Sequence, residues 1–346
     1  MAKNIFDLIN AKDIAAYWEN MSQNRAPYVG EQLFPADKQL SLNLEWINGQ
    51  SSIPVVLNLS AFDANVIPRS REGFKKNSAM MPFFKESYYI DEELRQQLNM
   101  VLETGKSAYI DVIMNRIFND EVKLVEAARA QRERMRMSAL TTGAITLASN
   151  GQAVSYDYGV PAGHKATVLT TWGTSGATPI ADIRGWMDTI EDDTGVRPER
   201  AICNSSVWNR LLADASIKNT IFVYSQGVST ISDSALVAFL KDQLNLSVYV
   251  NNKRYKNELG TSTKYVADDT FALFPEGRLG TTWFGTTPEE SDLLSSSVAN
   301  VSIVDTGVAI TTMKKADPVN VETKVSQICL PSFESADQIF IADVTA

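Results

Sequence analysis

The residue types that carry out most enzyme chemistry are scarce in this sequence. His164 is the only histidine, and the two cysteines, Cys203 and Cys329, lie far apart without a CxxC partner. Histidine-based triads and two-histidine metal sites therefore have a single candidate, which ends the turn-like segment Pro161-Ala162-Gly163-His164. We interpret His164 as a turn or surface residue, and we expect both thiols to be reduced and buried.

Two acidic groups and one glycine pair have the chemistry to bind a cation or a phosphate. Glu191-Asp192-Asp193 and the group Glu289, Glu290 and Asp292 carry carboxylates, the ligands that hard cations prefer. A helix end and a solvated loop explain these two acidic groups better than a cation-binding site does. Gly173–Gly176 lacks the lysine that follows a phosphate-binding loop, so it is interpreted as a plain turn.

Motifs of the common enzyme families do not occur in the sequence. There is no Walker A loop, no GxGxxG after a strand, and no GxSxG, HExxH or EF-hand pattern. We therefore predict that the protein is not an enzyme and that it has no catalytic, cofactor-binding or metal-binding residue.

Charge bears on nucleic-acid binding in two opposing ways. Arg129, Arg132, Arg134 and Arg136 could contact phosphates, although they also suit the end of a long helix. The whole chain carries a net charge of −9, which argues against a protein whose main task is to grip nucleic acid. We expect non-specific contact with nucleic acid at most. No apolar run reaches the roughly 18 residues that span a membrane, so we predict no membrane partner and see no signal peptide.

One segment dominates the helical pattern that must position these residues. Apolar residues recur at three- and four-residue spacing from Ser107 to about Leu140, and no Gly or Pro interrupts them before Gly143. Such a helix would be about 50 Å long at ~1.5 Å per residue. Shorter helices are predicted over 6–24 and 91–102.

Alternating apolar residues and turn signals predict several hairpins and one long strand. Turns are expected at Asn48-Gly49, Asn150-Gly151 and Asp305-Thr306-Gly307. A long strand is predicted from Val319 to Cys329, with Pro331 at its end. Four residues are expected to share one strand face before the first turn: Leu40, Leu42, Leu44 and Trp46. Between 170 and 297 helices and strands alternate, which predicts a compact α/β module.

A basic, aromatic stretch between 66 and 90 shows neither the helical nor the strand spacing of apolar residues. It reads VIPRSREGFKKNSAMMPFFKESYYI, with five Lys or Arg between Arg69 and Lys85 against the single acid Glu72. The aromatic pairs Phe83-Phe84 and Tyr88-Tyr89 follow. An arm of ~25 residues has no core of its own, so another copy of the chain is expected to supply its partner surface.

In this order the elements resemble the major capsid proteins of tailed bacteriophages, in particular the lambda-type major capsid protein E family. Val66–Arg71 is similar to the start of that family's extended loop, and Tyr88-Tyr89-Ile90 to its end. The helix from Ser107 resembles the family's spine helix. Later, Phe271–Pro275 resembles a strand and turn of its axial domain, and Thr311–Pro331 its long closing strand.

The resemblance covers the chain from about residue 30 and implies an α+β, Hong Kong 97-like phage capsid fold. It implies an N-terminal arm, an extended β-hairpin loop, a long spine helix, a peripheral β-sheet domain and an axial α/β domain. The arm is expected over 1–39 and the loop over 64–90. The peripheral domain is expected to comprise 40–63, 91–165 and 300–331, with the spine helix at about 107–140. The axial domain is expected to comprise 166–299 and 332–346. The loop departs from the family at Glu72 and Phe74-Lys75-Lys76, where Gly and Ser are more usual.

The function that the resemblance implies is self-assembly into hexamers and pentamers of an icosahedral head shell around double-stranded DNA. Its implied partners are a separate scaffold protein, a portal and, as an open addition, a decoration protein. The implied location is the virion capsid, assembled in the bacterial host cytoplasm. Two alternatives stay open: an encapsulin-like cargo shell, and an α/β enzyme built on 170–297 with the arm as an oligomerisation element.

The expected contact between subunits joins the basic loop to an acidic surface. Asp182 to Asp193 holds five acids and one Arg. Isolated exposed ion pairs are worth only ~0–1 kcal/mol, so charge would set the register while the aromatics contribute most of the affinity. The candidates are Arg69, Arg71, Lys75, Lys76, Phe83 and Phe84 on the loop, and Asp188, Glu191, Asp192 and Asp193 on the receiving surface.

Overall fold

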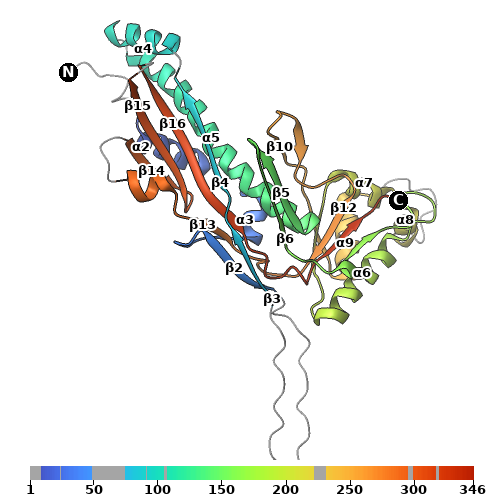
Figure 1. Ribbon diagram of the computed structural model, residues 1–346. Coiled ribbons are helices and arrows are strands. Elements are labelled where there is room, and N and C mark those ends of the chain that lie inside the picture. Colours follow the sequence, from blue (N-terminus) through green and yellow to red (C-terminus); the bar gives the residue numbers. More distant parts are fainter. Residues whose placement is uncertain are drawn as a thin grey trace, which may run out of the picture. The chain divides into compact units, whose positions relative to one another are not determined.

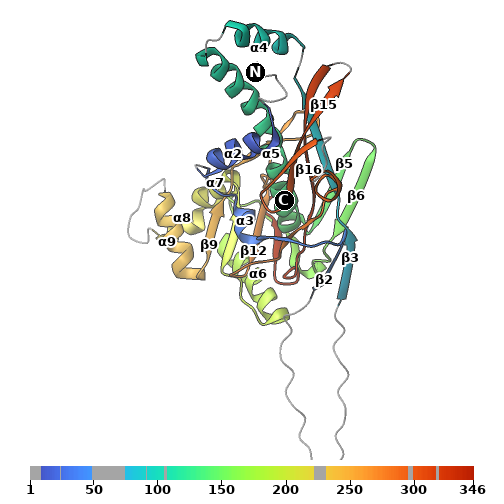
Figure 2. The same cartoon turned by 90° about the vertical axis from the view of Figure 1, so that its left-hand side faces the viewer.

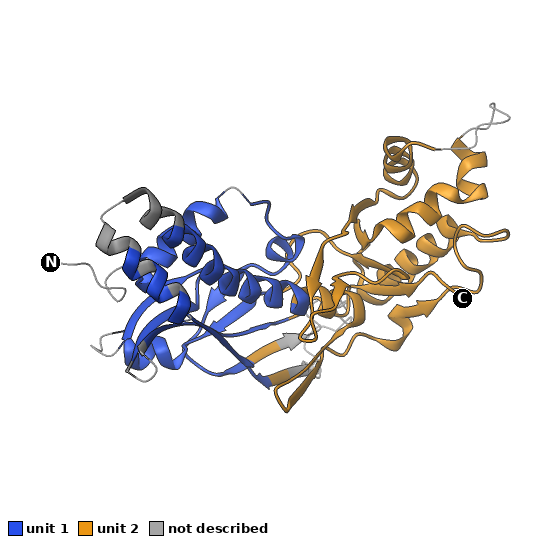
Figure 3. Ribbon diagram, turned by 90° about the horizontal axis from the view of Figure 1, so that it is seen from above, with its two compact units in different colours: residues 1–44, 79–135, 281–332 blue, residues 45–78, 136–280, 333–346 orange. Residues whose placement is uncertain are grey.

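The computed structural model describes residues 9–23, 25–48, 75–90, 92–104, 107–221, 231–294, 299–316 and 319–346. The chain divides into two compact units, each assembled from separate parts of the sequence (Figure 3). Unit 1 comprises 1–44, 79–135 and 281–332, and unit 2 comprises 45–78, 136–280 and 333–346.

Unit 1 is built around the long strand β16, Val319–Pro331. Along one edge β16 pairs antiparallel with β15, and Figures 1 and 2 show these two strands side by side. The other edge pairs with β4 and then with β13, so the strand is long enough to hold two neighbours in succession. The remaining strands of this six-stranded sheet are β4 Phe83–Tyr89, β1 Ala36–Lys38, β13 Thr282–Gly285, β14 Ala299–Val304 and β15 Val308–Ala316.

Helix α5, Ser107–Thr142, confirms the predicted helix over 107–140. In unit 1 it runs along β4 and β16 (Figure 1), and Gln327 Nε2 donates to the carbonyl of Ala128 at 3.0 Å. The helix ends at Gly143, whose φ of +76° suits glycine and where a Cβ would lie 2.7 Å from Val160 Cγ2. The other helices that the structure describes in unit 1 are α2 Ala11–Ser22, α3 Val29–Leu33, α4 Glu92–Thr104 and the π-helical turn η2 Glu289–Leu293.

Unit 2 contains a five-stranded sheet in the order β7-β17-β12-β8-β9. Its core is aromatic: Trp172 stacks on Trp186 with ring centroids 5.6 Å apart, and Trp186 stacks on Phe340 at 5.4 Å. The strands are β7 Lys165–Thr167, β8 Arg200–Cys203, β9 Ser247–Val250, β12 Thr270–Phe274 and β17 Phe340–Asp343. The helices are η1 Ala162–His164, α6 Pro179–Thr194, α7 Ser205–Ala213, α8 Ala215–Ile221 and α9 Asp233–Leu244.

Three two-stranded sheets complete the described strands. β5 Ala144–Ser149 and β6 Gln152–Asp157 form the predicted hairpin, with positive φ at Asn150 and Gly151 as its turn type requires. In the six-stranded sheet of unit 1, the pair β14–β15 likewise confirms the hairpin predicted at Asp305-Thr306-Gly307. The other two two-stranded sheets are β10 Arg254–Lys256 with β11 Ser262–Lys264, and β2 Asn43–Asn48 with β3 Lys75–Met80.

Two strand predictions need correction. The strand that was predicted from Leu40 begins at Asn43, and Leu40 is 89% exposed while Leu44 is buried, because the alternation continues before the backbone joins a ladder. The residues that follow the turn expected at Asn48-Gly49 lie outside the described residues, and within the described chain β2 pairs with β3. The closing strand is β16 alone, since residues 311–316 belong to the antiparallel neighbour β15. In the part of the chain that the structure describes, no helix is both long and apolar enough to cross a membrane.

Candidate functional site

The basic half of the predicted contact surface is only partly within the described residues. Arg69 and Arg71 lie outside them. Lys75 and Lys76 begin strand β3, although the positions of their side chains are also outside the description. The backbone therefore places these two lysines at one end of the β2–β3 ladder.

The aromatic pair lies in a regular strand rather than in an irregular arm. β4 pairs with β16 over seven residues, from Phe83 opposite Ile328 to Tyr89 opposite Glu322. Because neighbouring strand residues face opposite sides of a sheet, Phe83 is 42% exposed while Phe84 is half-buried. The Lys85 Nζ lies 5.5 Å from the centre of the Phe83 ring. Phe83 is thus the member of the pair that is available to a partner.

A second aromatic and cationic group lies on the same sheet face as Phe83. Lys315 Nζ donates to Tyr89 Oη at 2.8 Å, lies 3.2 Å from a Glu322 carboxylate oxygen and sits 4.1 Å from the Tyr89 ring centroid. Burial alone would raise the pKa of Glu322, but hydrogen bonds from Ser87, Lys315 and Tyr89 outweigh it and hold that pKa below its ordinary value. Tyr89 remains 52% exposed, so this face carries two accessible aromatic rings beside cations.

The acidic half of the predicted surface lies on α6, and its acids already have partners. Arg197 Nη1 pairs with Asp188 at 2.7 Å and also with Glu191, and all three side chains are more than a third exposed. Asp193 accepts from or pairs with His164 Nε2 at 3.1 Å. Among the described residues Asp192 forms no ion pair, and it is exposed. The structure therefore places the four predicted acids together at one end of α6, where they differ in how far their charge is already compensated by partners within the subunit.

His164 is not a surface residue. It lies in the short helix η1, its side chain is fully buried, and its ring is stacked against Phe340 at 6.2 Å. The prediction of a turn is confirmed and the prediction of a surface position is wrong, because the core of unit 2 closes over the ring. Nothing in the local sequence signals this burial, since Phe340 is far away along the chain.

The arginines of α5 are structural. Arg129 binds Glu31 through two hydrogen bonds of 2.7 and 2.9 Å, and its pKa is raised chiefly by that pairing. Arg132 is 4% exposed and donates to Gln327 Oε1 at 2.9 Å and to Asp305 Oδ2 at 2.8 Å. The guanidinium groups of these two residues are therefore bound to partners within the subunit.

The second acidic group lies in the helical turn η2 and not in a solvated loop, although its member Asp292 is exposed. Glu289 is 4% exposed in η2, where it pairs with Lys324 Nζ at 2.5 Å and accepts from Ser326 Oγ at 2.9 Å. Glu290 pairs with Lys38. Across the described ranges no cluster of His, Cys, Asp and Glu has metal-binding geometry. Cys203 and Cys329 are buried as predicted and form no disulfide bond, and burial raises the pKa of the Cys203 thiol to about 12.

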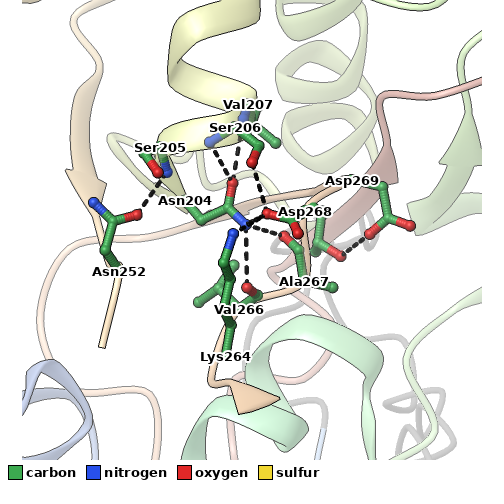
Figure 4. A network of polar contacts seen from close by, with 11 residues as sticks. Asn204, Ser205, Ser206, Val207, Asn252, Lys264, Val266, Ala267, Asp268 and Asp269 are labelled. Carbon is green, nitrogen blue, oxygen red and sulfur yellow. Dashed lines mark hydrogen bonds and ion pairs between the residues drawn. The ribbon is translucent and has the colours of Figure 1, made fainter. Parts of the chain in front are cut away.

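The densest polar network of unit 2 surrounds Asn204 and supports structure rather than chemistry (Figure 4). Asn204 is fully buried, and its Oδ1 accepts from the backbone N–H groups of Ser206 and Val207, so it caps α7. Its Nδ2 donates to the carbonyl of Ala267 and to Asp268 Oδ1 at 2.8 and 2.7 Å. The side chain thus ties the start of a helix to the loop before β12.

Comparison with protein families decides what this arrangement is for. The family model described as phage major capsid protein E matches residues 10–344. The chain belongs to the phage major capsid protein E family. It therefore assembles with copies of itself into the icosahedral head shell of a tailed bacteriophage. An encapsulin-like cargo shell is less well supported, since the match is to a phage capsid family.

Solved structures place this capsid protein in the Hong Kong 97-like fold. It is similar to a proposed capsid protein of a prophage from Escherichia coli CFT073, at 13% identity and a TM-score of 0.60, over 98% of this chain and 99% of that one. It also resembles a phage-related protein from Bordetella bronchiseptica RB50, at 8% identity and 0.53, over 97% of each chain. A third similar structure is the cyanophage A-1(L) capsid asymmetric unit, at 11% identity and 0.52, over 92% of each chain. No curated protein matches the sequence.

Proposed function

We propose that the stretch from Arg69 to Tyr89 of one capsid subunit docks on the acidic end of α6 in a neighbouring subunit. The exposed ring of Phe83 carries this proposal, because an aromatic side chain on a regular strand is a rigid anchor for a partner. Around it the stretch is cationic, with Arg69, Arg71, Lys75, Lys76 and Lys85.

The receiving surface supports the proposal through its charge. The segment 182–197 carries five carboxylates and two arginines, Arg184 and Arg197, a net charge of −3. Because Arg197 already neutralises part of Asp188 and Glu191, the incoming cations meet Asp192 as the acid with the least intramolecular compensation. Exposed pairs of this kind set register and rate of association, whereas the aromatic ring contributes most of the affinity.

The same proposal assigns the parts of the chain to roles in the shell. Residues 1–39 form an arm and 64–90 the extended loop. The peripheral domain comprises 40–63, 91–165 and 300–331, and the axial domain comprises 166–299 and 332–346. A separate scaffold protein, a portal and a decoration protein complete the assembly, which takes place in the host cytoplasm.

Single alanine variants of the aromatic pair separate docking from folding. Phe83→Ala removes an exposed ring, so we expect soluble subunits with wild-type unfolding but at least a tenfold loss of closed shells by negative-stain electron microscopy and sedimentation. Phe84→Ala removes a half-buried ring of the subunit's own sheet, and we expect lower thermal stability instead. Normal shells from Phe83→Ala would contradict the proposal.

A charge variant tests the receiving surface with a matched control. Asp192→Lys should slow assembly most at low salt, and Arg71→Glu in the same chain should restore part of the rate. Asp242→Lys, an equally exposed acid on α9, is the control and should leave assembly unchanged. Equal effects at both positions would show that net charge, not this surface, is responsible.

A further inference from the structure

Glu121 is a carboxyl group buried between α5 and the sheet of unit 1. It is 3% exposed, and its Oε1 accepts a hydrogen bond from Thr323 Oγ1 on β16 at 2.8 Å. Its Oε2 is buried without a hydrogen-bond partner among the described residues. An ionised carboxylate in this position would bury a charge that nothing nearby compensates.

The nearest cation on the helix does not serve as a counter-ion. Lys123 is exposed and pairs with Asp120 at 2.7 Å on the outer side of α5. Asp120 adds a negative charge next to Glu121 and so disfavours a second one. The local electrostatics of the helix therefore oppose ionisation of the buried group.

The strand next to β16 offers a partner for a protonated carboxyl. Thr312 of β15 lies directly opposite Thr323, so both side chains are on the face that contacts α5. Thr312 is 4% exposed, and its Oγ1 also lacks a hydrogen-bond partner among the described residues. A neutral carboxylic acid has one O–H donor in addition to its acceptors. Protonation of Glu121 thus supplies an O–H donor on the sheet face where Thr312 Oγ1 has no hydrogen-bond partner among the described residues.

Other titratable groups on this side of the sheet lie at its margins. Opposite Thr323 and Val325, strand β4 places Tyr88 and Glu86, both exposed. Lys314 of β15 is exposed, and from α2 the half-buried Tyr17 donates to Asn119 at 2.9 Å. None of these side chains is buried with Glu121. The buried cation of this layer, Arg132, lies further along α5 and is bound to Gln327 and Asp305, so it does not compensate the carboxyl group.

We propose that Glu121 holds a proton in the folded subunit and acts as a pH-sensitive latch between α5 and β16. Burial raises its pKa from 4.5 to about 7, against the opposing effect of the Thr323 hydrogen bond. Since the folded pKa lies above the unfolded one, the folded state binds the extra proton between these two values. The contribution of Glu121 to stability is therefore highest at low pH, falls as the pH rises from 4.5 to 7, and levels off above 7.

The latch would be located in the helix and strand that hold unit 1 together. At mildly acidic pH the neutral group lets α5 pack tightly on β16, and at alkaline pH the charge favours local opening of this layer. The inference does not depend on how the loop of one subunit meets α6 of the next, because Glu121 lies inside a single subunit.

Amide hydrogen exchange of unassembled subunits tests the latch directly. Wild type and Glu121→Gln are compared at the same pH, so that the intrinsic exchange rates cancel. We expect equal protection of α5 and β16 at about pH 5, and at about pH 8.5 an exchange rate in the wild type higher by on the order of a hundredfold. The ratio should change with a midpoint near 7. A ratio that is independent of pH would overturn the proposal.

Two further variants separate the titration of Glu121 from that of its neighbours. Asp120→Asn removes a neighbouring exposed charge, so the midpoint should move down only slightly, whereas abolition of the transition would assign it to Asp120 and overturn the proposal. If Glu121→Gln is unstable, infrared difference spectra of the wild type decide. A protonated-carboxyl band that disappears between about pH 6 and 8.5, and is absent from Glu121→Leu, is expected; a band unchanged by that variant would overturn the assignment.

Discussion

The two units hold their interiors together by different means. Unit 1 buries charged side chains between a helix and a sheet, with Arg132 bound to Asp305 and Glu289 bound to Lys324. Unit 2 instead packs aromatic rings, with Trp186 in contact with Trp172, Phe271 and Phe340. Apolar burial is strong but non-directional, whereas buried polar contacts need one geometry to be satisfied. We infer that unit 2 is stable across conditions, while unit 1 is specific in register and sensitive to pH.

The largest effect that this comparison predicts is in the aromatic core. Trp186→Ala removes a ring that three aromatic neighbours contact, and we expect a loss of about 3–5 kcal/mol in the free energy of unfolding of unit 2. Urea denaturation followed by amide exchange locates the loss. Equal destabilisation of the amides of β16 would show that the two interiors are not independent.

A pair of arginines sharpens the comparison between buried and exposed charge. Among the described residues, Arg132→Ala leaves the Asp305 side chain with the hydrogen bond from Trp18 alone. Because Asp305 is partly exposed, we expect a loss of about 2–3 kcal/mol rather than the full cost of a buried pair. Arg197→Ala breaks two exposed ion pairs and should cost less than about 1 kcal/mol. Thermal unfolding of both variants checks the order, which equal losses would contradict.

Among the buried positions, the smallest expected effect is in the polar network of unit 2. Asn204→Ala removes the cap of α7 and the ties to the loop at 267–268, which should cost about 1–2 kcal/mol. Asn204→Asp keeps the two capping bonds but replaces the donors with a second carboxylate beside Asp268, so it adds charge repulsion to the loss of the loop ties. Circular dichroism melts of the two variants measure the difference. A melt of Asn204→Ala equal to wild type would mean that the network adds nothing beyond the aromatic core.

Long periodic segments could be predicted from the sequence, and contacts between distant residues could not. Helix α5 was predicted because its period runs without interruption, and β16 because its alternation and Pro331 set its extent. The spacing of apolar residues does not predict strand β4, because its adjacent aromatic pairs fit neither the helical nor the strand period and its partner lies far along the chain. Only the family resemblance implied a β-hairpin loop over 64–90. The exposure of Phe83 depends on the pairing of β4 with β16 alone.

The candidate site shows the same division. Residue types were sufficient to identify the acids of α6 as a group, yet their differences arise from Arg197 and His164, which reach them from other segments. The burial of Glu121 is visible only when β16 is in place against α5. The position of Glu121 on the helix does not predict its burial, because the polar residues of an amphipathic helix are expected to face solvent.

Strand β16 has a consequence for how the subunit is made. Its neighbour β4 leaves the ribosome more than two hundred residues earlier, since Tyr89 pairs with Glu322. At the usual 5–20 residues per second, β4 waits roughly 10–50 s for the strand that fixes Phe83 at the surface. A nascent chain therefore presents no finished docking face until β16 has been synthesised, and only chains that have passed this point are competent to join a growing shell.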